Sequence, residues 1–113
     1  MITYKPFDIV VVPFPFADDE SKYKHRPALV LSNEEYNQKN NNLILSMITS
    51  AKNSNFWSDH IITNYEGTNL QNKCVIRMKI FTIDTALVKG KIGALSKTDT
   101  RKIKQNLKVI LNS

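Results

Sequence analysis

The apolar segments of this 113-residue chain are short, and only the last one repeats with the period of a helix. Runs of about four to eight apolar residues that are rich in β-branched side chains and end at proline or polar turns predict strands. We expect strands over residues 7–14, 28–31, 43–48, 56–62, 73–83 and 91–95, with a helical turn over 34–37. Such a chain must bury short strands against one another, so the sequence predicts a mostly β (α+β) domain.

The C-terminal segment predicts a single amphipathic helix. Ser96 and Asp99 are spaced as in a capping box, with Asp in the place of the usual Glu. Apolar residues then recur at helical spacing on one face, at Ile103, Leu107 and Ile110. Together with the strands, this segment predicts a small β-barrel with a helix packed over it.

Length and composition favour one domain with a basic surface. The chain is 42% hydrophobic and 23% charged, which suits a single globular domain over residues 1–113. Sixteen Lys and Arg against ten Asp and Glu give a net charge of +6, which favours an acidic partner. The basic excess is greatest at the C-terminal end, where seven basic residues accompany one Asp from Lys89 onward.

Simple counts disfavour several classes of protein. One cysteine and two histidines cannot make an internal disulfide or a zinc site of His and Cys ligands. Three glycines and no Gly-x-Ser-x-Gly turn leave no nucleotide-binding loop and no serine-hydrolase nucleophile, so we expect no metal or cofactor. The longest apolar runs, such as residues 9–16, fall short of the ~18 residues that cross a bilayer, and no signal-peptide core is recognisable. We therefore expect a cytoplasmic protein without a membrane partner.

The remaining candidates for chemistry are cationic and polar side chains. They are His25, Arg26, Thr49, Ser50, Arg77 and Lys79. An RNA phosphate that is attacked by its own 2'-hydroxyl gains negative charge, and a guanidinium can donate two hydrogen bonds to its oxygens. Arg26 suits this role, and the hydroxyls of Thr49 and Ser50 could hold the phosphate at the end of a strand.

Each of these side chains also has a purely structural interpretation. Arg26 could neutralise the acidic segment that precedes it, and Thr49 and Ser50 could simply satisfy a turn. His60 lies in an apolar stretch, where the expected role is that of a hydrogen-bonded structural histidine. Trp57 could stack an RNA base, or it could belong to the core or to a dimer interface.

The strand expected over residues 73–83 should display positive charge. Alternation places Val75, Arg77, Lys79 and Phe81 on one face of this strand. Arg77 and Lys79 are therefore expected side by side on an outward surface.

Four ordered sequence blocks give the chain a likeness to a known family. The blocks are residues 7–16 (FDIVVVPFPF), 26–32 (RPALVLS), 48–50 (ITS) and 75–78 (VIRM) with 82–84 (TID). In this order and spacing they resemble the successive signatures of the MazF/PemK toxin family. The likeness covers about residues 7–95, which is most of the chain.

The resemblance implies a small SH3-like barrel with an appended helix, assembled as a homodimer. It implies the toxin of a type II toxin-antitoxin system, a metal-independent endoribonuclease that cuts single-stranded messenger RNA to a 2',3'-cyclic phosphate and a 5'-hydroxyl. A cognate antitoxin would lay a disordered acidic tail in the RNA groove, which suits the positive charge of the chain. By motif position, Arg26 corresponds to the family's catalytic arginine and Thr49 to its catalytic threonine.

The chain departs from the family pattern near the site. PemK-like relatives carry an aspartate, proposed as a general base, where this chain has Lys79, and Phe81 and Phe7 replace a common arginine and glycine. His25 is a candidate base in place of the missing carboxylate, because histidine titrates near neutral pH. The expected RNA contacts are Ser50, Arg77, Lys79, Lys24 and Phe16.

Two other functions stay open. One is a binding module of the same fold, in which Lys79 marks lost catalysis and the groove still holds RNA or an antitoxin peptide. The other is a gyrase inhibitor of the CcdB type, which shares the fold. Those inhibitors act through C-terminal aromatic residues, whereas residues 107–113 of this chain contain none.

Overall fold

The computed structural model describes residues 3–14, 24–51, 56–71 and 73–112. Its body is one antiparallel sheet of six strands in the order β4-β5-β3-β2-β1-β6. The strands are β1 (Asp8–Phe14), β2 (Lys24–Val30), β3 (Asn42–Ser50), β4 (His60–Ile61), β5 (Cys74–Asp84) and β6 (Gly90–Ala94). The helical elements are α1 (Glu34–Asn40), the 3-10 turn η3 (Thr85–Leu87) and α2 (Lys97–Ile110).

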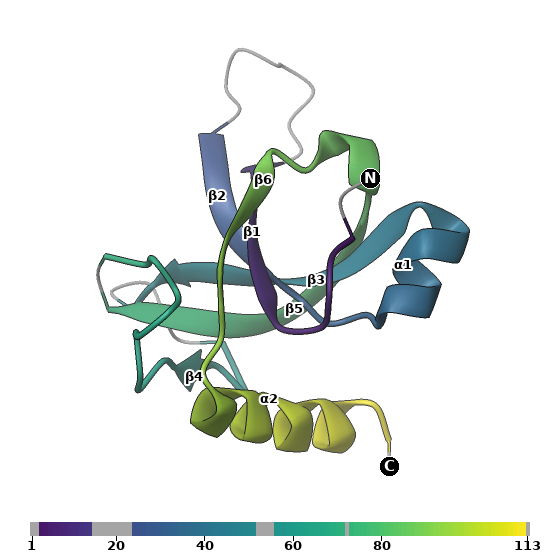
Figure 1. The fold of residues 1–113 in the computed structure, drawn as a ribbon. Helices are drawn as coiled ribbons and strands as arrows, with labels where there is room; N and C mark the ends of the chain where they lie inside the picture. The colour runs from purple at the N-terminus through teal and green to yellow at the C-terminus, as the bar shows by residue number, and fades with distance from the viewer. Residues whose placement is uncertain (1–2, 15–23, 52–55, 72, 113) are drawn as a thin grey trace.

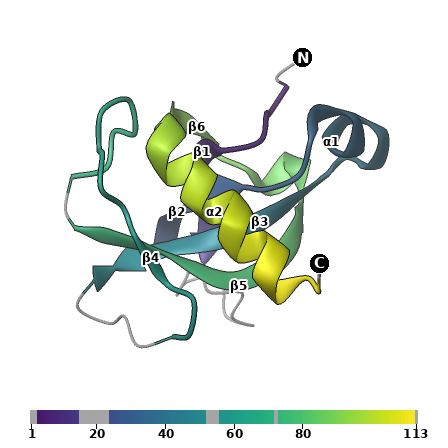
Figure 2. The same ribbon diagram turned by 90° about the horizontal axis from the view of Figure 1, so that it is seen from below.

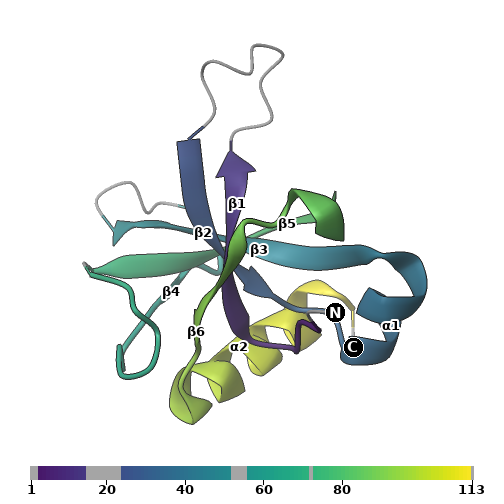
Figure 3. The ribbon, with the colours of Figure 1, turned by 45° about the horizontal axis from the view of Figure 1, so that its top comes forward.

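The sheet curls into a half-barrel, and α2 covers one side of it. Figures 1 and 2 show α2 lying across the sheet, and Figure 3 shows β1 standing between β2 and β6. This mostly β architecture with a C-terminal helix confirms the predicted fold class.

The sheet is buried on both faces, which explains its continuous apolar runs. Beneath α2 lies one core cluster, made of Ile9, Leu29, Ile48, Ile62, Ile76, Met78, Leu95 and Ile103. A second cluster consists of Tyr4, Val10, Val12, Ala28, Val30, Leu43, Leu45 and Ile83. Consecutive residues such as Ile9 and Val10 belong to different clusters because side chains alternate between the two faces of a strand. Where both faces are covered, most residues in the middle of the strands are apolar. Ser46 of β3 is a buried exception, and its hydroxyl donates a hydrogen bond to the Arg77 carbonyl.

Most predicted strands are confirmed, with changed ends. The clearest change is in β2, which begins at Lys24 rather than at residue 28. Its early residues pair with β1, with Arg26 opposite Val12 and Lys24 opposite Phe14. Hydrogen bonding to a neighbouring strand extends β2 through polar residues that have no strand preference of their own.

The predicted strand over residues 56–62 is wrong in its first half, because only His60–Ile61 pairs with β5. Phe56 to Asp59 form a turn in which the Asp59 N–H donates to the Phe56 carbonyl at 3.2 Å. Ser58 has a φ of 71°, which a strand does not allow. Trp57 is 72% exposed on this turn, so its interpretation as a core residue is also wrong.

The expected pair of outward cations on β5 is a further error. The Arg77 side chain is only 17% exposed, and its Nη2 lies 3.4 Å from a carboxylate oxygen of Asp59. Its guanidinium carbon also lies 5.5 Å from the centre of the Phe56 ring. Asp59 and Phe56 of the turn therefore contact Arg77, whereas Lys79 stays exposed.

Helix α2 begins where the capping pattern predicted. The Ser96 hydroxyl accepts a hydrogen bond from the Asp99 N–H at 3.2 Å and donates one to the Asp99 carboxylate at 2.9 Å. Ile103 is fully buried beneath the helix, as its spacing predicted. Within the described residues, neither helix is long and apolar enough to span a membrane.

Candidate active site

A pocket of about 350 Å³ opens where β2 begins and β3 ends. Its polar lining is His25, Arg26, Thr49, Ser50, Asn69, Gln71 and Lys73, and its apolar lining is Val11, Pro27, Ile48, Leu70, Cys74 and Ile92. Among the described residues that line the pocket, two are Lys or Arg and none is Asp or Glu. This charge balance favours an anionic ligand.

Strand register brings Arg26 and Thr49 together. Strands β2 and β3 are antiparallel, and the pair of their ladder nearest the pocket is Ala28 opposite Met47. The same register continued by two residues sets Arg26 opposite Thr49, and both side chains line the pocket. The guanidinium and the hydroxyl singled out in the sequence therefore face a common space.

Another part of the pocket wall comes from residues 62–71 between β4 and β5, here called the strap. Its residues 69–71 line the pocket. The Tyr65 hydroxyl accepts a hydrogen bond from the Cys74 N–H at 2.8 Å, and the Ala94 N–H donates to the Gly67 carbonyl at 2.9 Å. Since these bonds reach β5 and the end of β6, the strap has a defined position.

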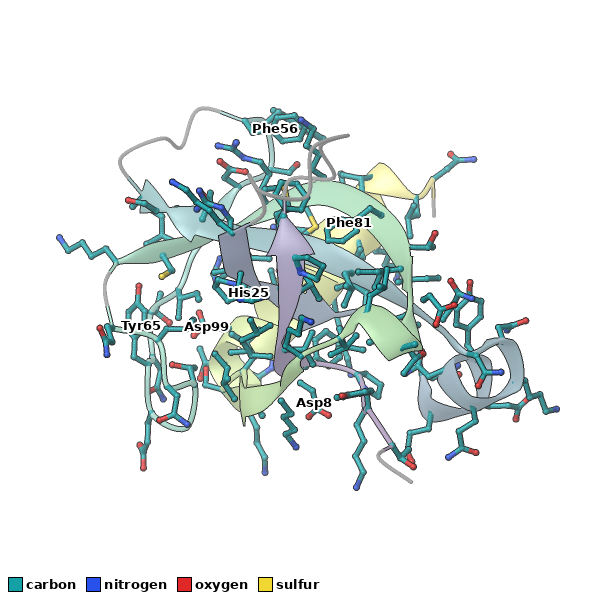
Figure 4. All side chains as sticks on the ribbon, turned by 90° about the horizontal axis from the view of Figure 1, so that it is seen from above. Asp8, His25, Phe56, Tyr65, Phe81 and Asp99 are labelled. Carbon is teal, nitrogen blue, oxygen red and sulfur yellow. The ribbon has the colours of Figure 1, made fainter. Side chains whose placement is uncertain are left out.

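Asp99 of α2 holds the first residues of the strap. Its buried carboxylate accepts hydrogen bonds from His60 Nε2 at 2.7 Å, from the Thr63 N–H at 3.0 Å and from the Asn64 N–H at 3.0 Å. Burial alone would raise the pKa of Asp99, but the hydrogen bonds, that of His60 foremost, lower it from 3.8 to about 2. The predicted structural role of His60 is thereby confirmed, and Figure 4 shows Asp99, Tyr65 and His25 on the side of the molecule away from α1.

Comparison with known proteins identifies the family. A family model described as PemK-like, MazF-like toxin of type II toxin-antitoxin system matches residues 5–111. The chain belongs to this family. The resemblance drawn from the four sequence blocks is confirmed, while a search of curated proteins finds no match to the toxin.

Solved structures of similar proteins share the fold of this toxin. MazF (Form-I) from Deinococcus radiodurans is 15% identical, with 100% of each chain covered and a TM-score of 0.77. An endoribonuclease in complex with its cognate antitoxin from Mycobacterial species is 14% identical, with 98% of this chain and 95% of that chain covered and a TM-score of 0.73. The Mycobacterium tuberculosis toxin MazF-mt6 is 17% identical, with coverages of 93% and 96% and a TM-score of 0.72. At these identities, the likeness shows the fold alone.

The structure brings together four of the candidate site residues of this toxin, namely His25, Arg26, Thr49 and Ser50. Arg77, Lys79 and Lys24 are not among the residues that line the pocket. Lys24 is exposed at the first position of β2, and Lys79 is exposed on β5. Phe16 lies outside the described residues.

The sequence did not predict the pocket residues that lie on the strap or between the strap and β5. Asn69, Gln71 and Lys73 line the pocket, yet no motif in the sequence marks them. Of these three residues, only Lys73 could have been placed near the pocket, because it precedes Cys74 at the start of β5, and Cys74 pairs with Ser50 at the end of β3. The two others reach the pocket only because the strap folds back against β6.

Gly93 lies where β6 and the strap approach most closely. A Cβ atom added there would lie 2.4 Å from the Gly67 carbonyl oxygen and 2.6 Å from that of Thr68. Both are backbone atoms, so Gly93→Ala must displace the strap, and we expect the free energy of unfolding to fall by roughly 1–3 kcal/mol in urea denaturation. The exposed neighbour Ala94→Ser should change it by less than about 0.5 kcal/mol. Equal stability of the Gly93 variant and wild type would contradict this close contact.

Proposed function

We propose that this toxin is a metal-independent endoribonuclease that cuts single-stranded messenger RNA in the cytoplasm. The observation that carries the proposal is that Arg26 and Thr49, from two neighbouring strands, line one pocket whose described lining contains no carboxylate. RNA presents a phosphate anion at every nucleotide, and an arginine beside a hydroxyl donor is suited to hold that anion. Family membership and the likeness to an endoribonuclease from Mycobacterial species, at a TM-score of 0.72, support this assignment.

The proposed reaction is attack of a 2'-hydroxyl on the adjacent phosphorus. A bond from the 2'-oxygen to phosphorus forms, and the bond from phosphorus to the 5'-oxygen breaks, which leaves a 2',3'-cyclic phosphate and a 5'-hydroxyl. His25 is the candidate to take the proton of the attacking hydroxyl, and solvent water supplies the proton that the 5'-oxygen gains as it leaves. Arg26 and Thr49 donate hydrogen bonds to the non-bridging oxygens, whose charge grows in the transition state, with Ser50 as a further donor.

We also propose two protein partners, an acidic antitoxin and a second copy of the toxin. One solved relative is a MazE-MazF complex from Deinococcus radiodurans, 16% identical with a TM-score of 0.75. The net charge of +6 suits an acidic antitoxin tail. Trp57 and Ile61, which are 72% and 57% exposed, supply apolar surface of the kind that a homodimer interface covers.

Incubation of a long, mixed-sequence RNA with the purified toxin in EDTA tests the proposal. We expect cuts at one short recurring sequence, mapped by primer extension. Salt-dependent RNA binding without any cut would instead support the binding module, in which lysine at position 79 replaces the acid of PemK-like relatives. Absence of both binding and cleavage would contradict the proposal and its alternative together.

Thr49→Val removes the proposed hydroxyl donor with little change of shape. We expect the single-turnover cleavage rate to fall roughly 100-fold, because loss of one donor to a developing anion has an effect of this size. Thr49→Ser keeps the hydroxyl and should retain most of the rate. If both variants lost activity equally, the hydroxyl would not be the group that acts.

A further inference from the structure

The outer face of α2 carries a line of cations, here called the basic stripe. Its members are Lys97, Arg101, Lys104 and Lys108. At about 100° per residue, all of them fall within about 60° of the helix circumference, and they span about 16 Å of its length. Lys97, Arg101 and Lys104 are exposed and, with Thr100, line a hollow of about 300 Å³.

No carboxylate of the described residues compensates the charge of Lys97, Arg101 or Lys104 in the basic stripe. Asp99 is the only acidic residue from Lys89 onward, and its carboxylate is buried and bound to the strap. The ion pairs of the described residues include none with Lys97, Arg101 or Lys104. Lys104 Nζ lies 5.6 Å from the centre of the Phe7 ring. Because no carboxylate of the described residues competes for these three cations, they can still bind an anionic partner.

The strap connects the pocket with the first turn of α2, on the side of the helix that carries Asp99. Its early residues Thr63 and Asn64 are bound by Asp99 in the first turn of α2, and its residues 69–71 line the pocket. Figures 1 and 2 show the segment between β4 and β5 running beside the start of α2. Because Asp99 lies about 160° around the helix axis from Lys97, RNA that leaves the pocket along the strap reaches the basic stripe by passing around the N-terminal end of α2.

We propose that the basic stripe binds the phosphate backbone of RNA that flanks the segment held in the pocket. The inference rests on the proposed function for the identity of the ligand. Successive cations are separated by about 4.5–6 Å along the helix axis, which presents a regular line of charge to a phosphodiester chain. Lys97, Thr100, Arg101 and Lys104 line the hollow, so no aliphatic or aromatic residue of the described chain forms an anchoring pocket there for an acidic peptide. This composition favours RNA over the antitoxin tail.

The test compares wild type with the variant Lys97→Gln/Arg101→Gln/Lys104→Gln, which keeps good helix formers at all three positions. The probes are fluorescent 2'-O-methyl RNAs of about 30 and about 6 nucleotides, which lack the attacking hydroxyl, and binding is measured by anisotropy. Three phosphate contacts on a single strand contribute a slope of about 2 in log affinity against log salt, or roughly 20-fold between about 50 and 200 mM salt. We expect the variant to lose this slope on the long RNA and to bind the short RNA as wild type does.

A matched control removes the same number of charges elsewhere, in the variant Lys5→Gln/Lys39→Gln/Lys102→Gln. Lys102 lies on α2 about 140° from Lys97, and all three lysines are exposed. This control should keep the salt slope of wild type. An equal loss in both variants, or an unchanged slope in the stripe variant, would overturn the inference.

Three further outcomes separate this inference from other proposals. If the stripe variant lost affinity for a polyglutamate peptide but kept its RNA binding, the partner would be an acidic peptide and the inference would be wrong. If wild type bound long RNA through the stripe yet never cut it, the proposed endoribonuclease activity would fail while the inference held. If RNA were cut but the stripe variant bound and cut long RNA like wild type, the inference alone would fail.

Discussion

Arg26→Ala is expected to slow RNA cleavage by at least about 100-fold, the largest effect of any single substitution in the pocket. The guanidinium can donate two hydrogen bonds of fixed geometry to a phosphate whose charge increases in the transition state. The loss should appear mainly in kcat, since the contact strengthens as charge develops. Single-turnover cleavage of an RNA that carries one mapped site measures it.

Two comparisons isolate the role of the Arg26 guanidinium. Arg26→Lys keeps the charge but loses the paired donors, so its rate should lie between those of wild type and Arg26→Ala. Lys39→Ala removes an exposed cation that pairs with Glu35 on α1, and it should leave the rate unchanged. Because Arg26 is exposed, its substitution should change stability by no more than about 0.5 kcal/mol. Cleavage by Arg26→Ala at the wild-type rate would remove arginine from the mechanism.

Asp99→Asn is expected to lower the free energy of unfolding by about 3 kcal/mol and the Tm by roughly 10 °C. The carboxylate accepts hydrogen bonds from α2, β4 and the strap, and an amide would turn one acceptor into a donor that faces other donors. Asp84→Asn is a suitable control, because the Ala86 N–H at 2.8 Å can donate equally well to an Asn oxygen. Similar stability of wild type and Asp99→Asn in urea at neutral pH would contradict this network.

The same carboxylate should make stability depend on pH. The pKa of Asp99 is about 2 in the folded toxin, below its ordinary value of 3.8, so the unfolded chain binds the proton more readily. The resulting stabilisation of about 2 kcal/mol is complete above the unfolded value and is lost as the pH falls from about 4 to about 2. The difference in free energy of unfolding between wild type and Asp99→Asn should therefore decrease by about 2 kcal/mol as the pH falls from about 4 to about 2. A difference independent of pH would show that the pKa of Asp99 is not lowered.

The sequence predicts those parts of the fold that depend on local pattern. Ser96 as a helix cap and Ile103 as a core residue both follow from spacing within one segment. The partners of Asp99 could not be predicted, because Thr63 and Asn64 lie on a strap with no periodic pattern. Arg77 was misjudged for a related reason, since strand alternation does not reveal that a turn carrying Asp59 folds over it.

The sequence could predict those pocket residues whose positions depend only on the pairing of β2 with β3. Arg26 lies near the start of β2 and Thr49 near the end of β3, and these strands pair with each other, so two local motifs meet without any knowledge of the loops. The contribution of Asn69 and Gln71 depends on the close approach of the strap to Gly93, which no motif announces. Loop placement is therefore the part of this site that sequence patterns leave open.

Phe7 illustrates a departure from the family pattern that the structure explains. Its φ is 70°, in the left-handed region that favours glycine, the residue common there in relatives. The Phe7 N–H donates to the Val30 carbonyl at 2.6 Å, and its ring packs against the core cluster beneath α2. Packing of a large ring therefore holds a backbone conformation that glycine adopts without strain.

The chemical nature of the RNA ends made in EDTA tests most directly whether this pocket promotes attack by a 2'-hydroxyl. We expect mass spectrometry of the products to show a 2',3'-cyclic phosphate on each new 3' end and a hydroxyl on each new 5' end. New 5' ends that carry phosphate would mean that water or another nucleophile attacks the phosphorus, and they would contradict the roles given to Arg26, Thr49 and His25.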